Sequence, residues 1–226
     1  MHATILDLTT IMETSHLHQK DKLPLEDMGK LLGKPLISTI KELLDSLDVP
    51  EDKPLIKGQI DQGAIIEGRV FIAEGAKVEA TALVRGPCYI GPSSEVRHGA
   101  YIRGNVYVGK DCVVGHATEV KGSVFLDGAK AGHFAYVGDS ILGPDVNLGA
   151  GTKLANLKLD KGEVKFTDPK TGKRTKSGLK KLGAILGTGV QVGCNAVLSP
   201  GTILLEGALV APCAHIIGTK GQGIHK

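Results

Sequence analysis

Two sets of polar side chains recur at near-constant intervals in the middle of the chain, and both could do chemistry. The cationic set consists of Arg85, Arg103 and Lys121, and the imidazole set consists of His98, His116 and His133. Arginine and lysine suit phosphate or carboxylate groups, whereas a neutral histidine can serve as a general base or as a metal ligand. The two sets favour acid–base chemistry beside an anion-binding site. Their alternatives are a solvated charged edge, hydrogen-bonded histidines at corners of the fold, or a metal site.

The intervals of seventeen and eighteen residues gain meaning from a six-residue repeat. Aliphatic residues recur at every sixth position, namely Ile60, Ile66, Ile72, Val78, Val84, Ile90, Val96, Ile102, Val108, Val114 and Val120. A hexapeptide repeat of this kind is typical of a parallel β-helix, in which three units make one turn of a triangular prism. Residues eighteen apart then stack in successive turns about 4.8 Å apart. We therefore expect each polar set to form a ladder, with both ladders on the same part of the prism wall.

The repeat continues with two five-residue steps, at Phe125 and Leu142, and it resumes at Leu186 after an interruption. The interrupting residues are rich in lysine and in turn-forming types, and they predict an inserted loop over residues 155–184. Asp168–Gly172 has the composition of a hairpin tip. A long loop on such a regular scaffold is more often functional than accidental.

The predicted fold is therefore all-β, a parallel β-helix of hexapeptide repeats over residues 58–219. Residues 1–57 lie outside the repeat and are expected to form a short α-helical appendage. Within them Leu36–Leu47 has apolar residues at helical spacing, and Pro35 suits the start of a helix. Residues 220–226 are expected to be a tail.

Composition narrows the class of protein. The 226 residues include 31 glycines, no tryptophan and only 4% aromatics, so the core must be built from aliphatic side chains. A net charge of +3 is too small a bias to predict nucleic-acid binding. No apolar run approaches the roughly 20 residues that cross a bilayer. The four cysteines lack C-x-x-C spacing and are expected to be reduced thiols in a cytoplasmic protein.

Flat exposed faces and open ends are a liability for a single prism. Three prisms packed side by side would bury those faces and create clefts between subunits. We therefore expect a homotrimer.

Several motifs carry a resemblance to a known family. The stretches A-K-A-G-H-F-A-Y-V-G-D, D-V-N-L-G-A-G-T and V-G-H-A-T-E-V-K resemble the acetyltransferase domain of bifunctional N-acetylglucosamine-1-phosphate uridyltransferases. Two others, A-N-L-K-L-D-K-G-E-V-K and K-K-L-G-A-I-L-G-T-G-V-Q-V-G, resemble archaeal-type sugar-1-phosphate nucleotidylyltransferases with a similar C-terminal β-helix. The similarity covers roughly residues 84–217. It implies a left-handed coil, acetyl-CoA as co-substrate, no metal in the acetyl-transfer site, and sites at the subunit interfaces of a homotrimer.

The resemblance also implies roles for individual residues. His133 matches the general base of the family, and Arg103 and Lys121 match its sugar-phosphate-binding residues, which the ladders single out independently. Further matches are sugar-site polar residues (Tyr136, Asn147, Asn156), a lysine of the archaeal-type loop (Lys165) and acetyl-CoA contacts (Ala150, Cys194). The implied activity is N-acetylation of an amino-sugar phosphate such as glucosamine 1-phosphate, and the implied partners are small molecules.

Two departures from the family pattern bear on this function. Leu157 replaces a tyrosine of the sugar site, and Cys194 stands where a serine usually contacts acetyl-CoA. Residues 1–57 contain no glycine-rich phosphate loop, so we expect no nucleotidyltransferase half in these 226 residues.

Three other functions stay open at this point. One is a metalloenzyme of the γ-carbonic-anhydrase kind, although the histidines lack its H-x-x-x-x-H spacing. The second is a non-catalytic scaffold or regulator that binds a sugar phosphate or nucleotide sugar. The third is an acyltransferase with another donor or acceptor.

Overall fold

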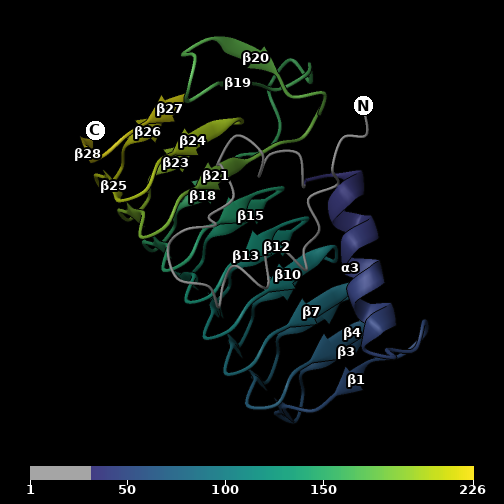
Figure 1. Ribbon diagram of the computed structural model, residues 1–226. Coiled ribbons are helices and arrows are strands. Elements are labelled where there is room, and N and C mark those ends of the chain that lie inside the picture. Colours follow the sequence, from purple (N-terminus) through teal and green to yellow (C-terminus); the bar gives the residue numbers. More distant parts are fainter. Residues whose placement is uncertain (1–31) are drawn as a thin grey trace.

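Three stacks of short parallel strands form the prism in the computed structural model, which describes residues 32–226 (Figure 1). Sheet A contains β1 (Leu55–Ile56), β4 (Val70–Ile72), β7 (Cys88–Ile90), β10 (Val106–Val108), β13 (Val124–Phe125), β16 (Ile141–Leu142), β21 (Ala184–Leu186), β24 (Thr202–Leu204) and β27 (Thr219–Lys220). Sheet B contains β2 (Gln59–Ile60), β5 (Lys77–Val78), β8 (Glu95–Val96), β11 (Val113–His116), β14 (Lys130–His133), β17 (Asn147–Leu148), β22 (Gln191–Val192), β25 (Ala208–Val210) and β28 (Gly223–His225). Sheet C contains β3 (Ile65–Glu67), β6 (Leu83–Arg85), β9 (Tyr101–Ile102), β12 (Glu119–Lys121), β15 (Tyr136–Gly138), β18 (Lys153–Leu154), β23 (Val197–Leu198) and β26 (His215–Ile216). The predicted parallel β-helix is confirmed, while its handedness stays a prediction.

The strand register follows the repeat that the sequence predicts. Val78 pairs with Val96, eighteen residues later, in sheet B. Val114 pairs with Ala131, seventeen residues later, because the first five-residue step shortens that turn. Leu142 pairs with Leu186, so the chain returns to register after the insertion.

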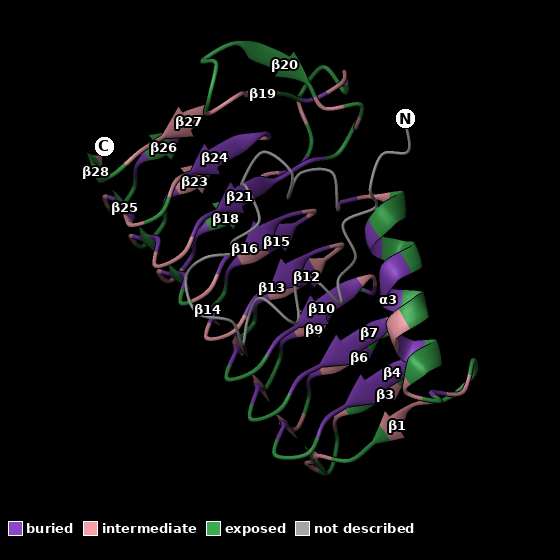
Figure 2. Cartoon of the chain, in the orientation of Figure 1, coloured by how far each residue is buried: buried purple, intermediate pink, exposed green. Residues whose placement is uncertain are grey.

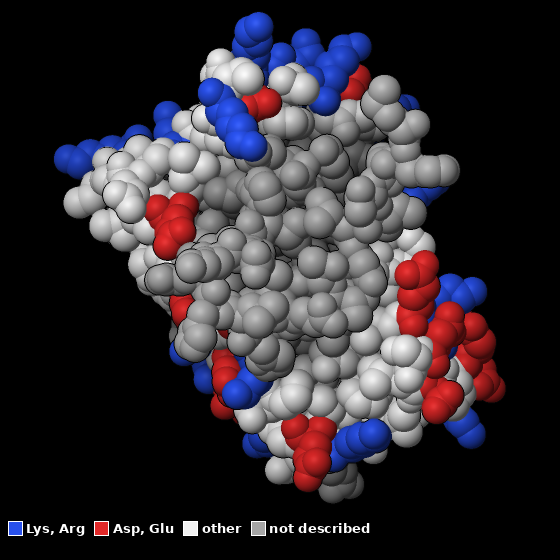
Figure 3. Space-filling view, in the orientation of Figure 1, with Lys and Arg blue, Asp and Glu red and all other residues white. Residues whose placement is uncertain are grey.

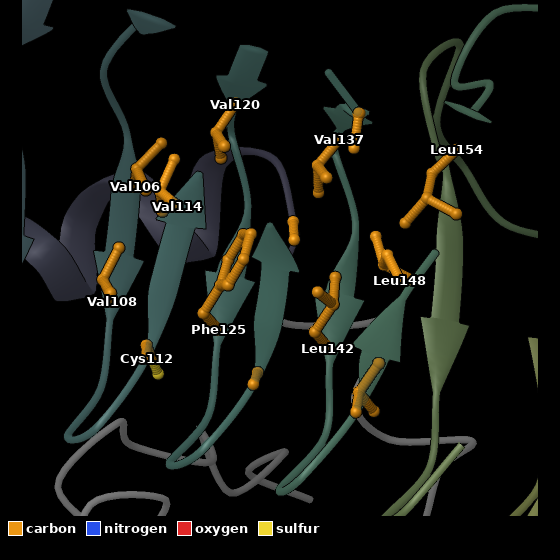
Figure 4. Close-up of a cluster of buried hydrophobic side chains, with 14 of the residues drawn as sticks. Val106, Val108, Cys112, Val114, Val120, Phe125, Val137, Leu142, Leu148 and Leu154 are labelled. Atoms are coloured by element: carbon orange, nitrogen blue, oxygen red, sulfur yellow. The ribbon is translucent and has the colours of Figure 1, made fainter. Parts of the chain in front are cut away.

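The repeated aliphatic side chains point into the prism and form a narrow, continuous core (Figure 4). Val114, Val120, Val137 and Leu142 each have no exposed surface. Each strand from β4 to β18 contributes at least one inward side chain, and β10 contributes two, Val106 and Val108, so the core contacts are repeated from turn to turn along the axis. This regularity holds the outward and corner residues at fixed spacings.

A single helix among the described residues, α3 (Lys34–Ser46), covers the outward face of sheet A (Figure 2). Its buried side chains include Leu36, Ile40 and Leu44, which belong to the same apolar cluster as three aromatic residues of sheet A. Those aromatics are Phe71, Tyr89 and Tyr107, whose rings stack at 5.4 and 5.1 Å. The predicted helix is present, and the rest of the expected appendage, residues 1–31, lies outside the described residues. No helix within residues 32–226 is long and apolar enough to cross a membrane.

Arg69 joins the last turn of α3 and the segment that follows it to the prism. Its side chain is only 8% exposed. One guanidinium nitrogen, Nη2, donates to Asp45 at 2.6 Å and to the carbonyl oxygen of Val49 at 2.9 Å. Nη1 reaches Glu51 at 3.3 Å.

Replacing Arg69 with alanine is expected to lower the free energy of unfolding by about 2 kcal/mol, since it leaves the carbonyl oxygen of the buried Val49 without its donor. Urea unfolding followed by circular dichroism measures this change. Arg97→Ala is the matched control, because its ion pair with Glu95 lies on the exposed surface at 2.8 Å and is worth at most about 1 kcal/mol. Equal losses in the two variants would contradict a docking role for Arg69.

The insertion contains a two-stranded antiparallel hairpin, β19 (Lys165–Thr167) and β20 (Arg174–Lys176). At its tip, Asp168 accepts hydrogen bonds from the backbone N–H groups of Lys170 and Thr171 at 2.8 and 2.9 Å, which confirms the predicted turn. The expected tail is corrected: β28 pairs with β25, so residues 223–225 extend sheet B. Short backbone pairing of this kind is available to any residue type, and the glycine-rich end carries no aliphatic repeat to signal it.

Candidate functional site

The two polar ladders lie at the two corners that bound sheet C. Each turn of the chain passes from sheet A to sheet B and then to sheet C. His116 and His133 end β11 and β14, at the corner between sheets B and C. Lys121 ends β12, at the corner between sheets C and A. The expectation that both ladders share one part of the wall is therefore corrected: a strand of sheet C separates them.

The imidazole ladder is unequal in its contacts. The rings of His98 and His116 stack at 4.2 Å. The Nδ1 atom of His116 lies 3.0 Å from the carbonyl oxygen of His98, and His98 itself lies 3.5 Å from Glu79. His98 and His116 are thus corner residues whose side chains have polar partners. The side chain of His133 is exposed and has no hydrogen-bond or ion-pair partner among the described residues, so its ring is open to a ligand.

A glycine before each histidine brings the two turns together. Gly115 precedes His116 and Gly132 precedes His133. A Cβ atom at position 115 would lie 1.7 Å from the carbonyl oxygen of Gly132, a distance that no side chain tolerates. The glycine before His116 thus permits the backbone register in which His116 pairs with His133, whereas a Cβ atom at Gly132 would meet nothing within 4 Å.

The corner between sheets B and C also carries the residues that match acetyl-CoA contacts. The N–H of Gly151 donates to the carbonyl oxygen of His133 at 3.1 Å. The N–H of Asn195 donates to the carbonyl oxygen of Ala150 at 2.8 Å. His133, Ala150 and the exposed Cys194 therefore occupy successive turns of one column. A donor molecule lying along this corner would pass directly beside the imidazole.

Phe134 is a feature of this corner that sequence reasoning missed. Its side chain is 54% exposed and its φ is +36°, a conformation that is uncommon for a bulky residue. It lies beside Gly151, whose added Cβ would be 3.2 Å from the Phe134 ring. The sequence indicated Phe134 only by its position immediately after His133. An aromatic residue at a corner of the repeat does not by itself predict a contact or a role.

The cationic ladder is neutralised turn by turn. Arg85 pairs with Glu67 at 2.6 Å, and Arg103 pairs with Glu119 at 2.7 Å. The ring of Tyr101 lies between the two guanidinium groups, 5.6 and 5.8 Å from them. Carboxylate and aromatic partners thus separate the like charges, which explains how the column tolerates stacked cations.

At the next turns the ladder becomes a compact polar cluster. Lys121 donates to both oxygens of Asp139, at 2.9 and 3.2 Å. The Nδ2 atom of Asn156 donates to Oδ2 of the same carboxylate, and the hydroxyl of Tyr136 donates to Oδ1 of Asn156 at 3.4 Å. Three predicted site residues therefore meet around Asp139, which sequence reasoning missed. The sequence did contain an indication of this contact, because Asp139, the last residue of Y-V-G-D, follows Lys121 by eighteen residues and so stacks on it.

The Tyr136 hydroxyl stays a hydrogen-bond donor at neutral pH. Burial raises the pKa of Tyr136, and the negative charges of Glu119 and Asp139 raise this pKa further. The protonated hydroxyl, the primary amide and the ammonium group form a polar surface in which Asp139 balances the charge of Lys121.

The remaining predicted residues lie on other faces. Asn147 is exposed on sheet B, between Lys130 and Gln191 in the strand register. Lys165 is exposed in β19, beside β24 of sheet A. The insertion carries many cations, and Lys and Arg side chains gather at that end of the molecule (Figure 3). The structure does not group either residue with the polar cluster of Lys121, Tyr136, Asp139 and Asn156, called the Lys121 cluster below.

Comparison with known proteins places this geometry in a family. The model of the GMPPB C-terminal domain matches residues 84–215. The chain belongs to the GMPPB C-terminal domain family. The match spans every predicted site residue, whereas α3 and the first turns of the prism precede it.

Curated relatives of this family member are bifunctional. It is 35% identical to the bifunctional sugar-1-phosphate nucleotidylyltransferase/acetyltransferase of Sulfurisphaera tokodaii, over 97% of this chain and 57% of that protein. It is 35% identical to the bifunctional protein GlmU of Methanocaldococcus jannaschii, over 82% of this chain and 45% of the relative. The GlmU of Methanococcus maripaludis strain C7 is 48% identical over 69% of this chain and 37% of its own length. The chain thus spans about half the length of these relatives, and the resemblance drawn from its motifs is confirmed.

Within residues 32–226, no three His, Cys, Asp or Glu side chains are grouped as metal ligands. The exposed Cys194 follows Gly193 at the corner, and no hydrogen bond or ion pair joins it to a basic side chain within residues 32–226.

Proposed function

We propose that this chain transfers an acetyl group from acetyl-CoA to the amine of an amino-sugar phosphate such as glucosamine 1-phosphate. The observation that carries the proposal is the exposed imidazole of His133, without a partner among the described residues, in the corner column of Ala150 and Cys194. The Lys121 cluster across sheet C adds a surface for the phosphate and hydroxyl groups of the acceptor.

The reaction needs one proton acceptor and a site for negative charge. Neutral His133 takes a proton from the amine as the amine nitrogen bonds to the thioester carbonyl carbon. The carbon–sulfur bond then breaks, and the coenzyme A thiolate leaves with the proton that His133 returns. Backbone N–H groups of the corner turns are the donors available to an oxyanion.

The other matched residues receive roles by position. Arg103 and Lys121 hold the acceptor's phosphate, and Tyr136 and Asn156 hold its ring. Asn147 lies on sheet B, so we assign it, together with Lys165, to the cleft that a neighbouring copy would form.

A homotrimer is part of the proposal. The candidate residues lie at the corners of a single prism, where the side chains of His133 and Cys194 are open to water. Acyl transfer is favoured where the site excludes water, and a second copy packed along the corner would supply that cover. Support comes from the exposed apolar side chains Ile65 and Leu209 on sheets C and B.

A thiol-release assay tests the activity: acetyl-CoA is mixed with a panel of amino-sugar 1-phosphates, amino-sugar 6-phosphates and unphosphorylated amino sugars. We expect release only with a phosphorylated amino sugar. Arg103→Ala is expected to raise the KM of that acceptor ten- to a hundredfold, the effect of one charge-assisted hydrogen bond, with the KM of acetyl-CoA unchanged.

The panel also separates the alternative functions. No release, together with calorimetric binding of a sugar phosphate or nucleotide sugar, would replace the enzyme with a non-catalytic binding protein. Sugar phosphates without an amine complete the panel, and release with these acceptors alone would make the protein an O-acyltransferase.

A further inference from the structure

Asp139 is the centre of the polar cluster at the corner between sheets C and A, although no chemistry has been assigned to it. Its carboxylate receives two hydrogen bonds from Lys121, at 2.9 and 3.2 Å, and one from Asn156. The side chains of Lys121 and Asp139 are 28% and 14% exposed, and Asn156 is 8% exposed. A carboxylate this sheltered is screened little by water, so its contacts hold their partners firmly.

The backbone is shaped around these contacts. A Cβ atom at Gly122 would lie 2.5 Å from Oδ1 of Asp139. A Cβ atom at Gly138 would lie 2.7 Å from both Nδ2 of Asn156 and the Tyr136 hydroxyl. Only residues without a side chain leave room for the cluster, and the five-residue steps of the repeat fall at the corners that hold Lys121 and Asp139. The glycines and the shortened turns thus make room for the cluster at this corner.

The chemistry of a carboxylate determines how its neighbours point. An ionised carboxylate only accepts hydrogen bonds, so Asn156 must turn its NH₂ group toward Asp139. Its carbonyl oxygen is then directed at the Tyr136 hydroxyl. The same carboxylate holds the Lys121 ammonium at the corner. One acidic side chain thus fixes three groups that we assign to the acceptor.

We propose that Asp139 is a positioning residue of the acceptor site: it orients Lys121 and Asn156, and through Asn156 the Tyr136 hydroxyl, for a phosphorylated amino sugar. This inference rests on the proposed function. It assigns Asp139 no contact with the reacting atoms, because His133 lies at the opposite corner of sheet C.

Asp139→Asn is the informative substitution, since it keeps the size of the side chain and removes its charge. The new amide cannot accept from Lys121 and Asn156 with both oxygens, so at least one partner is released. We expect the KM of the acceptor to rise about tenfold, with kcat within about threefold and the KM of acetyl-CoA unchanged. Glu95→Gln is the matched control, because Glu95 pairs with Arg97 at 2.8 Å on sheet B; it is expected to leave all three constants unchanged.

A double-substitution cycle distinguishes positioning from a general loss of stability. If Asp139 acts through Asn156, the KM increase in Asp139→Asn/Asn156→Ala will be smaller than the product of the two single increases. A product of independent effects would overturn the inference, as would an acceptor KM within twofold of wild type in Asp139→Asn. Should Asp139→Asn not fold, Asp139→Glu retains the charge one methylene further out, and it is expected to raise the acceptor KM in the same way.

The two proposals fail differently. A wild-type protein that acetylates the acceptor, alongside an Asp139→Asn variant with unchanged kinetics, would remove only the role of Asp139. A wild-type protein that neither acetylates nor binds any amino-sugar phosphate in calorimetry would remove the proposed function, and this inference with it.

Discussion

His133→Ala is expected to lower kcat for acetyl transfer by a factor of about 10² to 10⁴, the usual contribution of a general base. The fold should be unaffected, because the His133 side chain is exposed and has no partner among the described residues. The KM of the sugar phosphate should change little, since Arg103 and Lys121 hold the phosphate at the other corner of sheet C. Steady-state kinetics and a thermal melt on the same preparation measure both effects.

His116→Ala is the control for His133→Ala. It removes an exposed imidazole from the same column, one turn away, where the ring stacks on His98 at 4.2 Å. We expect it to retain most of the activity. Near-wild-type turnover in His133→Ala, or an equal loss in His116→Ala, would show that the base has been assigned to the wrong residue.

The sequence predicted the prism in unusual detail because its core has one repeating contact. The aliphatic residue that recurs once in each six-residue unit sets both the period and the register, so the shortened turns at Phe125 and Leu142 could be counted directly. The same counting correctly stacked His116 on His133. Counting could not show on which edge of sheet C each ladder lies. The repeat tells which residues stack along the prism axis, but the geometry of the corners decides where around the prism each stack lies.

The contacts at the corners lay beyond sequence reasoning for a related reason. Asp139 has a φ of +46° and Phe134 one of +36°, and residue type alone predicts neither conformation. The cluster around Asp139 depends on where such a corner turns the side chain. Its existence could be read only from the folded chain.

The sequence also contains a pattern of outward-facing aromatic residues that predicts where α3 packs. Phe71, Tyr89 and Tyr107 are spaced by eighteen residues, and their stacked rings form the surface on which α3 packs. Large aromatics that recur on an outward position predict a covered face, because such a stripe is rarely left in water. The location of α3 was therefore predictable in principle.

Val114→Asp is expected to prevent folding. Val114 has no exposed surface and lies in β11 between Val96 and Ala131, within the apolar column of the prism. An uncompensated carboxylate at this position costs more than about 4 kcal/mol, which is comparable to the whole stability of a typical domain. Far-UV circular dichroism and size-exclusion chromatography of the purified variant measure the loss.

The adjacent residue supplies the control for Val114→Asp. Val113 belongs to the same strand but points outward, and its register partners are Glu95 and Lys130. Val113→Asp should fold, with a change in the free energy of unfolding of about 1 kcal/mol or less, because water and Lys130 can both solvate the carboxylate. The contrast between neighbours tests the inward phase of the repeat directly. Equal stability of the two variants would mean that the apolar column runs through the other set of residues, and the corners that hold His133 and Lys121 would shift with it.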